Sequence, residues 1–188
     1  MTEKTIKLHT ETPTLLSEML IRRDMITDSH FAAIGRVAAN WGYFEALIDT
    51  WSIHLADMRA EIVVCFTAQI MGSRGKLDAF ISLANHLGAS PISLTKLNKL
   101  ASDTVGLAEQ RNRAVHDVWI LDDPDDPKRF EATAKRKLRL GPIPVATKDL
   151  RKLADRIDDH ASKFDKIAKE IFIALSSSHG KAVPGPYR

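Results

Sequence analysis

The sequence predicts a mostly α-helical protein, a bundle of four to five core helices with a small β-hairpin inserted before the last helix. Apolar residues recur at spacings of three and four over most of residues 28–175, which is the period of an amphipathic helix. Between about 118 and 140 the pattern changes to alternation, which is typical of a strand. Hydrophobic residues make up 44% of the 188, which suits one domain with a single core.

The first long helix is predicted from His30 to Ala56, after an N-terminal extension at residues 1–27. Within this extension, Pro13 to Ile21 could form a short leading helix. Thr27 to Ser29 supplies three candidate N-caps for the long helix. The bulky apolar stripe of this helix consists of Ile34, Val37, Trp41, Phe44, Ile48, Trp51 and Leu55.

Three more helical segments follow. Glu61 to Met71 is apolar on nearly all sides, and Gly72 to Gly75 is interpreted as a turn between helices. This glycine-containing segment superficially suggests a phosphate-binding loop, but it lacks the strand and the spacing of one. The next helix runs from Lys76 to Leu87, stops at Gly88, and precedes a helix capped by Ser93. The apolar positions expected on that last pattern are Leu94, Leu97, Ala101, Ala108, Val115 and Trp119.

A short antiparallel hairpin is predicted at about 118–140. Val118 to Leu121 and Arg129 to Leu140 are separated by a turn rich in Asp and Pro, and the second segment begins with alternating residues. Pro142 and Pro144 are expected to end the hairpin.

The chain is expected to finish with one more amphipathic helix. Thr147 is its predicted cap, and its apolar pattern continues to about Leu175. Residues 176–188 are rich in Gly, Pro and Ser, so we expect a disordered tail. The helical domain is therefore predicted to span residues 28–175.

Composition points to a cytoplasmic protein. Cys65 is the one cysteine, so no internal disulfide can form, and its apolar neighbours favour a small buried residue. Residues 1–14 do not resemble a secretory signal, and no run of 18 apolar residues predicts a membrane span. No spacing of His, Cys and carboxylates predicts a zinc site, and the group from Asp155 to His160 is interpreted as a solvated face.

The net charge of +3 permits nucleic acid as a partner without requiring it. One dense basic cluster follows the acidic turn of the hairpin, and it contains Lys135, Arg136, Lys137 and Arg139. These side chains are weak candidates for contacts with RNA phosphates, and a solvated hairpin is the preferred interpretation.

Residues 111–116, Arg-Asn-Arg-Ala-Val-His, carry the strongest chemical signal in the chain. Arg111 is a permanent cation, and His116 can exchange a proton near neutral pH. At about 100° per residue the two flank opposite sides of the apolar stripe, about 140° apart, so we expect them not to meet within one chain. A two-fold pairing of this helix with its copy would bring each Arg near the opposite His. Arg113 is expected to contact solvent or Glu109.

At these residues the chain resembles the HEPN superfamily. The signature of that family is an Arg, usually followed by a polar residue, and a His a few residues later; Arg111, Asn112 and His116 match it with four residues between Arg and His. The helical layout from Ser29 to Leu175 is similar as well. Further residues that look like those of bacterial HEPN-like proteins are Trp41, Glu45 and Trp119.

The resemblance implies a metal-independent endoribonuclease of toxin or phage-defence type that needs no cofactor and works as a homodimer with one shared cleft. RNA can be cut by attack of its own 2′-hydroxyl, which needs a base, an acid and a cation on the phosphate. His116 would be base or acid, Arg111 would hold the phosphoryl oxygens, and Asn112 would orient one of them. An antitoxin or a nucleotidyltransferase is a further partner that the family suggests.

Two alternatives stay open. An Arg and a His in the last turn of a helix also stabilise the helix by their interaction with its dipole, which needs no active site. Glu45 could likewise pair with a core arginine instead of tuning a site. The second function class is a non-catalytic HEPN-like dimer that binds a nucleotide, RNA or a partner protein. Cleavage of RNA in the presence of a chelator separates this class from the ribonuclease.

Overall fold

The computed structural model describes residues 26–121, 127–134 and 138–178, and this part of the chain is mostly helical, as predicted. It contains five helices and one three-stranded sheet. In chain order the elements are α2 (Asp28–Ala56), α3 (Ala60–Thr67), α4 (Gly72–His86), α5 (Pro91–His116), β1 (Val118–Leu121), β2 (Pro127–Thr133), β3 (Arg139–Pro144) and α6 (Thr147–Ser178).

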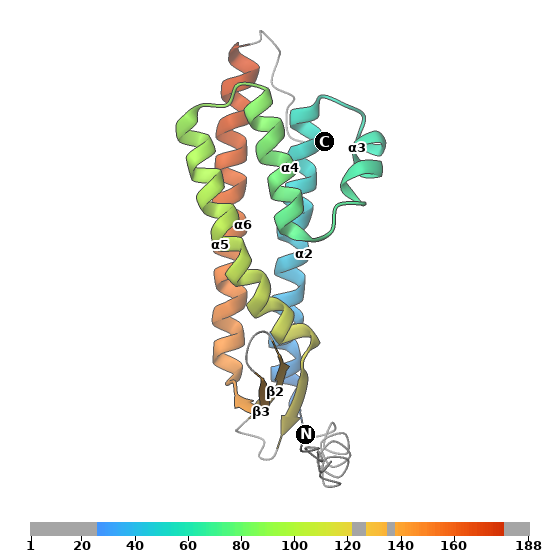
Figure 1. Ribbon diagram of the computed structural model, residues 1–188, viewed down its shortest axis with the longest axis vertical. Helices are drawn as coiled ribbons and strands as arrows, with labels where there is room; N and C mark the ends of the chain where they lie inside the picture. Colours follow the sequence, from blue (N-terminus) through green and yellow to red (C-terminus); the bar gives the residue numbers. More distant parts are fainter. Residues whose placement is uncertain (1–25, 122–126, 135–137, 179–188) are drawn as a thin grey trace, which may run out of the picture.

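Four of the helices form an elongated bundle (Figure 1). Helices α2, α4 and α6 run in one direction, and α5 runs in the opposite direction. Helix α2 packs against both α4 and α6, and α5 closes the ring because it also contacts α4 and α6. The short α3 lies at the side of the bundle against α2. The C-terminal end of α5 thus meets the sheet at one end of the bundle.

The core is made of large side chains from all four bundle helices. Phe164 lies edge-on to Phe44 and Phe80, with ring centroids 6.0 and 5.2 Å apart, a favourable aromatic geometry. The largest fully buried apolar side chains are Val37, Phe44, Ile48, Leu77, Phe80, Leu97, Ile157, Phe164 and Ile171. The first-helix stripe is confirmed for Val37, Trp41, Phe44, Ile48 and Leu55.

A polar pair lies inside this core, where Thr104 of α5 meets His160 of α6. His160 is buried, and its Nε2 lies 2.7 Å from the Thr104 hydroxyl, which also lies 2.9 Å from the carbonyl oxygen of Leu100. Since that hydroxyl donates to Leu100, it accepts from His160. The interpretation of His160 as a solvated residue was therefore wrong, whereas Asp155 is exposed and pairs with Arg36.

Two helix starts differ from the prediction. Ser90, not Ser93, caps α5: its side chain accepts from the backbone N–H of Ser93 at 3.2 Å, and Pro91 occupies the first helical position. Helix α4 begins at Gly72, four residues before the predicted Lys76. Thr27 is the N-cap of α2, one of the three candidates.

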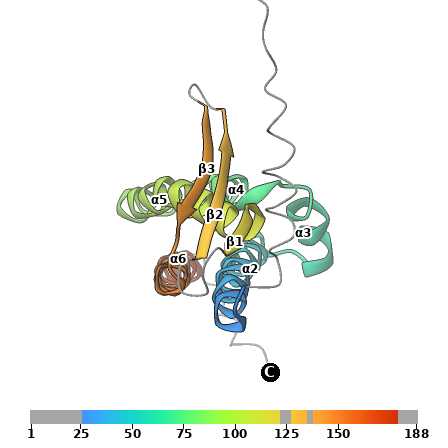
Figure 2. The ribbon, with the colours of Figure 1, turned by 90° about the horizontal axis from the view of Figure 1, so that it is seen from below.

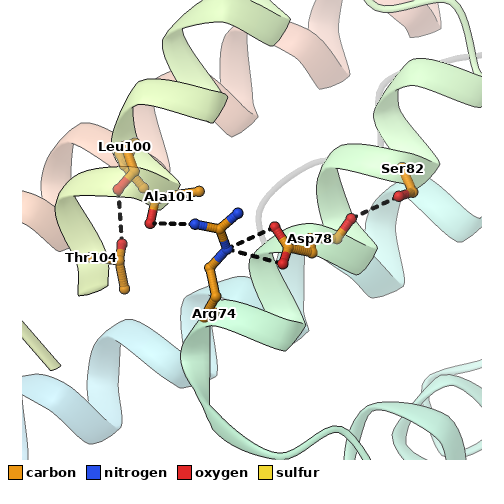
Figure 3. Close-up of polar contacts among 6 residues, drawn as sticks. All are labelled: Arg74, Asp78, Ser82, Leu100, Ala101 and Thr104. Atoms are coloured by element: carbon orange, nitrogen blue, oxygen red, sulfur yellow. Dashed lines mark hydrogen bonds and ion pairs between the residues drawn. The ribbon is translucent and has the colours of Figure 1, made fainter. Parts of the chain in front are cut away.

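A side chain near the start of α4 ties it to α5 (Figure 3). The guanidinium of Arg74 donates to both carboxylate oxygens of Asp78 at 2.9 Å. On its other side it donates to the carbonyl oxygen of Ala101 on α5, at 3.4 Å. Arg74 therefore lies in the first turn of α4, so the interpretation of residues 72–75 as a turn between helices was wrong.

The predicted hairpin is present, but a third strand extends it. The strand order is β1–β2–β3, all antiparallel. Pro142 and Pro144 lie within β3 rather than ending the hairpin, because β3 is an edge strand: Val145 donates its N–H to Pro127 across the ladder, so the nitrogens of Pro142 and Pro144 point away from β2. Figure 2 shows the β2–β3 ladder lying across the end of the bundle.

Helix α3 differs most from its predicted form. It ends at Thr67 instead of Met71, and its apolar residues are largely exposed, including Ile62, Val64 and Phe66. Cys65 is exposed too, so its interpretation as a buried residue was wrong. No helix within residues 26–121, 127–134 and 138–178 combines the length and apolarity that crossing a bilayer requires.

The remaining sequence predictions have mixed outcomes. The last helix continues to Ser178, past the predicted Leu175. The possible helix at 13–21 and residues 179–188 of the expected tail lie outside the described residues.

Candidate functional site

The three motif side chains come together at the C-terminal end of α5. Nη1 of Arg111 donates to the amide oxygen of Asn112 at 2.9 Å, and it lies 3.4 Å from Nε2 of His116. The expectation that Arg111 and His116 do not meet within one chain was therefore wrong. The angle between two helix positions does not limit a side chain as long as arginine, which crosses the last turn of the helix to reach the imidazole.

The contact defines which nitrogen of His116 can accept a proton. A guanidinium has five N–H donors and no acceptor, so a hydrogen bond from Arg111 requires a lone pair on Nε2. The proton of the neutral ring then sits on Nδ1. The side chain of His116 is exposed, so a ligand can reach this ring from solvent.

Arg111 is anchored on its inner side by Trp41 of α2. Its guanidinium carbon lies 6.0 Å from the centroid of the Trp41 ring, within the range of a cation–π contact. Its Nε is buried and has no hydrogen-bond partner among the described residues. Trp41 is itself 3% exposed, so it gives the guanidinium a rigid support.

Glu45 holds Trp41 rather than an arginine. The indole N–H of Trp41 donates to Oε1 of Glu45 at 3.1 Å, one helical turn further along α2. Within the described part of the chain Glu45 has no ion pair with an arginine, so the alternative of a carboxylate paired with a core Arg is not supported. Glu45 and Trp41 thus act on the motif through one chain of contacts that ends at Arg111.

Trp119 lies on β1 and does not touch the three motif side chains. Its indole N–H donates to the carbonyl oxygen of Ala114 at 2.9 Å, and its ring lies edge-on to that of His30, with centroids 4.5 Å apart. It therefore fastens the sheet to the bundle, beside the motif.

His30, which sequence reasoning missed, completes this junction. Its Nδ1 lies 3.0 Å from the hydroxyl of Thr147 at the start of α6, and its buried Nε2 has no partner among the described residues. Burial lowers the pKa of His30, because desolvation disfavours the imidazolium. The signal was available: His30 precedes Ala33, Val37 and Trp41 at the spacing of the buried stripe.

Asp117 follows the motif directly and joins it to the sheet. Its Oδ2 accepts from Nη1 of Arg129 on β2 at 2.6 Å and from Nη1 of Arg113 on α5 at 3.4 Å. Arg113 therefore contacts Asp117 instead of solvent or Glu109, because the helix ends at His116 and Asp117 turns back toward it. Arg113 and Asp117 are four residues apart, a visible signal, but the partnership with Arg129 depends on the sheet.

A groove of about 430 Å³ lies along the motif. We call it the motif groove, and it is lined by Val105, Ala108, Glu109, Asn112, Arg113, His116 and Asp117. All of these residues come from α5 and the position after it, so the protein supplies one wall of this groove and leaves the other open.

The basic cluster is only partly described. Lys135, Arg136 and Lys137 lie outside the described residues, and Arg139 begins β3 with an exposed side chain. In the ranges 26–121, 127–134 and 138–178 no three His, Cys, Asp or Glu side chains lie close enough to hold a metal ion. Comparison of the chain with protein-family models, with curated proteins and with solved structures finds no match.

Proposed function

We propose that the protein is a metal-independent endoribonuclease with an active site of the HEPN type. The observation that carries this proposal is the convergence of Arg111, Asn112 and His116, with 3.4 Å between the guanidinium and the imidazole. Asn112 and His116 line an open groove, and the guanidinium of Arg111 lies next to the His116 ring. A cation beside a titratable ring is suited to a reaction that builds negative charge on a phosphate.

The chemistry would use the nucleophile that RNA itself contains. In the free protein the lone pair of Nε2 on His116 accepts from Arg111. Once a bound phosphate draws the guanidinium onto its own oxygens, Nε2 would accept the proton of a 2′-hydroxyl as that oxygen attacks the adjacent phosphorus. The bond from phosphorus to the 5′-oxygen breaks, that oxygen takes a proton from water, and His116 releases the proton it gained to solvent. The products are a 2′,3′-cyclic phosphate and a 5′-hydroxyl.

Arg111 would stabilise the charge on the phosphoryl oxygens. Because Trp41 supports one side of its guanidinium, little motion is lost when a phosphate binds the other side. Asn112 accepts from Nη1 of Arg111 and so orients the cation. The Asn112 amide nitrogen stays available as a donor to a second phosphoryl oxygen.

A homodimer is part of the proposal. The motif groove has a wall on one side only, so a second copy of α5 facing it would enclose a substrate and exclude water. Each chain carries its own Arg111–His116 contact, so sharing of residues no longer follows from their separation along the helix. An antitoxin or a nucleotidyltransferase that covers the exposed His116 would restrain such an enzyme.

Cleavage of RNA by purified protein in excess chelator tests the proposal. We expect wild-type protein to cut single-stranded or loop RNA, and Arg111→Ala and His116→Ala each to abolish cutting while the circular dichroism spectrum and the thermal midpoint are kept. Matched controls are Arg151→Ala, an exposed arginine on α6, and His86→Ala, an exposed histidine that also ends a helix. These controls should cut like wild type.

Three results would contradict the proposal: wild-type protein that leaves every tested RNA intact, cutting that stops when metal is chelated, or motif variants that remain active. The first, together with RNA binding that needs Arg111, would instead support the non-catalytic binding module. A mixed dimer of Arg111→Ala with His116→Ala tests sharing: recovery of activity means that the two chains contribute to one cleft, and no recovery means that each chain cuts alone.

A further inference from the structure

A second cavity, of about 680 Å³, lies between the sheet, the C-terminal half of α5 and the first turns of α6. We call it the sheet groove. Its polar lining is rich in cations, which are Arg113, Arg129, Arg139, Lys152 and Arg156. Its volume is in the range of about 300–1,000 Å³ that holds a small molecule such as a nucleotide. Glu109 and Arg113 line both this cavity and the motif groove, so the two are neighbours on α5.

The strand register points four groove side chains in one direction. Trp119 on β1 pairs with Arg129 on β2. Along β2, Arg129, Glu131 and Thr133 are two residues apart and so lie on the same face of the sheet. Arg139 on β3 pairs with Thr133 of that face. A flat aromatic ring, a carboxylate and two guanidinium groups therefore project from one surface of the sheet into the groove.

Glu131 is the unusual residue in this set. It is 9% exposed as a whole residue, and no hydrogen bond or ion pair to the described residues occupies its carboxylate, whose oxygens face the open groove. The residue opposite it is Gly141, where a side chain would meet no atom within 4 Å, so the space in front of the carboxylate is open. A carboxylate accepts hydrogen bonds and donates none, so a ligand that displaces water from it must offer donor groups.

We propose that the sheet groove binds a guanine ribonucleotide. Guanine has two adjacent donors on its pairing edge, N1–H and the N2 amino group, which match the two oxygens of Glu131. Adenine and cytosine each present one amino group there, and uracil presents one N–H. Trp119 would offer the base an apolar wall, and Arg139 and Lys152 of the groove lining would supply cations for the phosphate, although Lys152 also lies 3.6 Å from Asp149.

This inference deepens the proposed function, on which its biological meaning rests: the nucleotide would be a guanosine next to the cut in the RNA. The same chemistry also fits a free guanine nucleotide. Arg129 lines the groove, and its ion pair with Asp117 restrains its guanidinium. A bound nucleotide would thus contact the same sheet that fixes the residue after His116.

Binding, not cleavage, tests the inference. The protein used is the full chain with Arg111→Ala and His116→Ala, which cannot cut RNA under the proposed function. Calorimetry measures GMP, AMP, CMP and UMP, and fluorescence anisotropy measures a heptauridine with or without one central G. We expect about tenfold tighter binding of GMP than of AMP, the discrimination typical of one bidentate contact. Preference only in the heptamer supports RNA as the source, and preference for GMP alone supports the free nucleotide.

Two substitutions separate recognition of the base from attraction of the phosphate. Glu131→Gln should abolish the guanine preference, and Arg139→Ala should weaken all four nucleotides alike, whereas the control Arg151→Ala should change nothing. Equal binding of the four bases, or tighter binding of all of them by Glu131→Gln, would overturn the inference, since the carboxylate would then only repel phosphate. Cleavage of RNA with no guanine preference would support the proposed ribonuclease and refute the guanine site. Guanine binding without cleavage would support the guanine site and refute the ribonuclease.

Discussion

The buried pair of Thr104 and His160 gives the sharpest test of how the bundle is held together. We expect Thr104→Val to destabilise the protein by about 1–3 kcal/mol, the cost of leaving a buried donor without a partner. Valine has nearly the shape of threonine, so no cavity forms. What is lost is the acceptor for Nε2–H of His160, which lies 2.7 Å from the hydroxyl in a core with 0% exposure at Thr104.

The same substitution should cost far less once His160 is gone. In a His160→Leu background the hydroxyl of Thr104 has only the carbonyl oxygen of Leu100 as its partner. A carbonyl inside an α-helix also accepts from the backbone N–H four residues later, so it keeps a partner when the hydroxyl is removed. Replacing both partners by apolar groups is nearly neutral. The interaction energy of the double-mutant cycle should therefore be about 1–3 kcal/mol.

Urea unfolding of the four proteins, followed by tryptophan fluorescence at about pH 7.5, measures this energy; the pH lies above the usual pKa of histidine. Thr104→Ser is the matched control, because it keeps the hydroxyl and removes one methyl group, at about 1 kcal/mol. Effects of Thr104→Val and His160→Leu that add to within about 0.5 kcal/mol would refute the reasoning, since independent sites behave in that way.

Two further predictions concern stability. Burial lowers the pKa of both His30 and His160 below 6.5, so below that pH the unfolded chain binds more protons than the folded one. The free energy of unfolding should therefore be highest above about pH 6.5 and fall as the pH drops through that value toward the lowered pKa values. A pH series of urea unfolding curves with no such fall would contradict this. Phe164→Ala removes a fully buried ring that contacts two others, and thermal or urea unfolding should report a loss of about 3–5 kcal/mol; a loss under 1 kcal/mol would mean that the core repacks freely.

Helical periodicity was sufficient to predict the bundle, because a long amphipathic helix carries the same signal many times. The stripe of α2 illustrates this: Val37, Phe44 and Ile48 were all identified and all are fully buried. The short segments carried too few repeats. In α3 the apolar residues predict burial by composition, but an eight-residue helix that packs mainly against α2 cannot bury them all.

The candidate site shows where angular arguments fail. The buried face of α5 includes Thr104, Leu107 and Ala114, a line on which Arg111 also lies at a spacing of three to four. The predicted apolar stripe includes Ala101, which is buried, but also Ala108 and Val115, which are only half-buried, so the buried face lies closer to Arg111 than the stripe indicates. Neither the reach of the arginine nor the turn after His116 is encoded in that periodicity. The third strand was missed because its prolines signal a strand end unless the strand lies at a sheet edge.

Asp117 has a consequence for the motif beside it. Its single oxygen Oδ2 binds one arginine from the motif helix and one from β2, so the backbone just after His116 is fastened from two directions. His116 itself stays exposed. An exposed ring on an immobilised backbone gives up little conformational entropy when it engages a ligand, because only its side-chain torsions remain to be fixed. The end of α5 is thus preorganised for a ligand while its imidazole stays open to solvent.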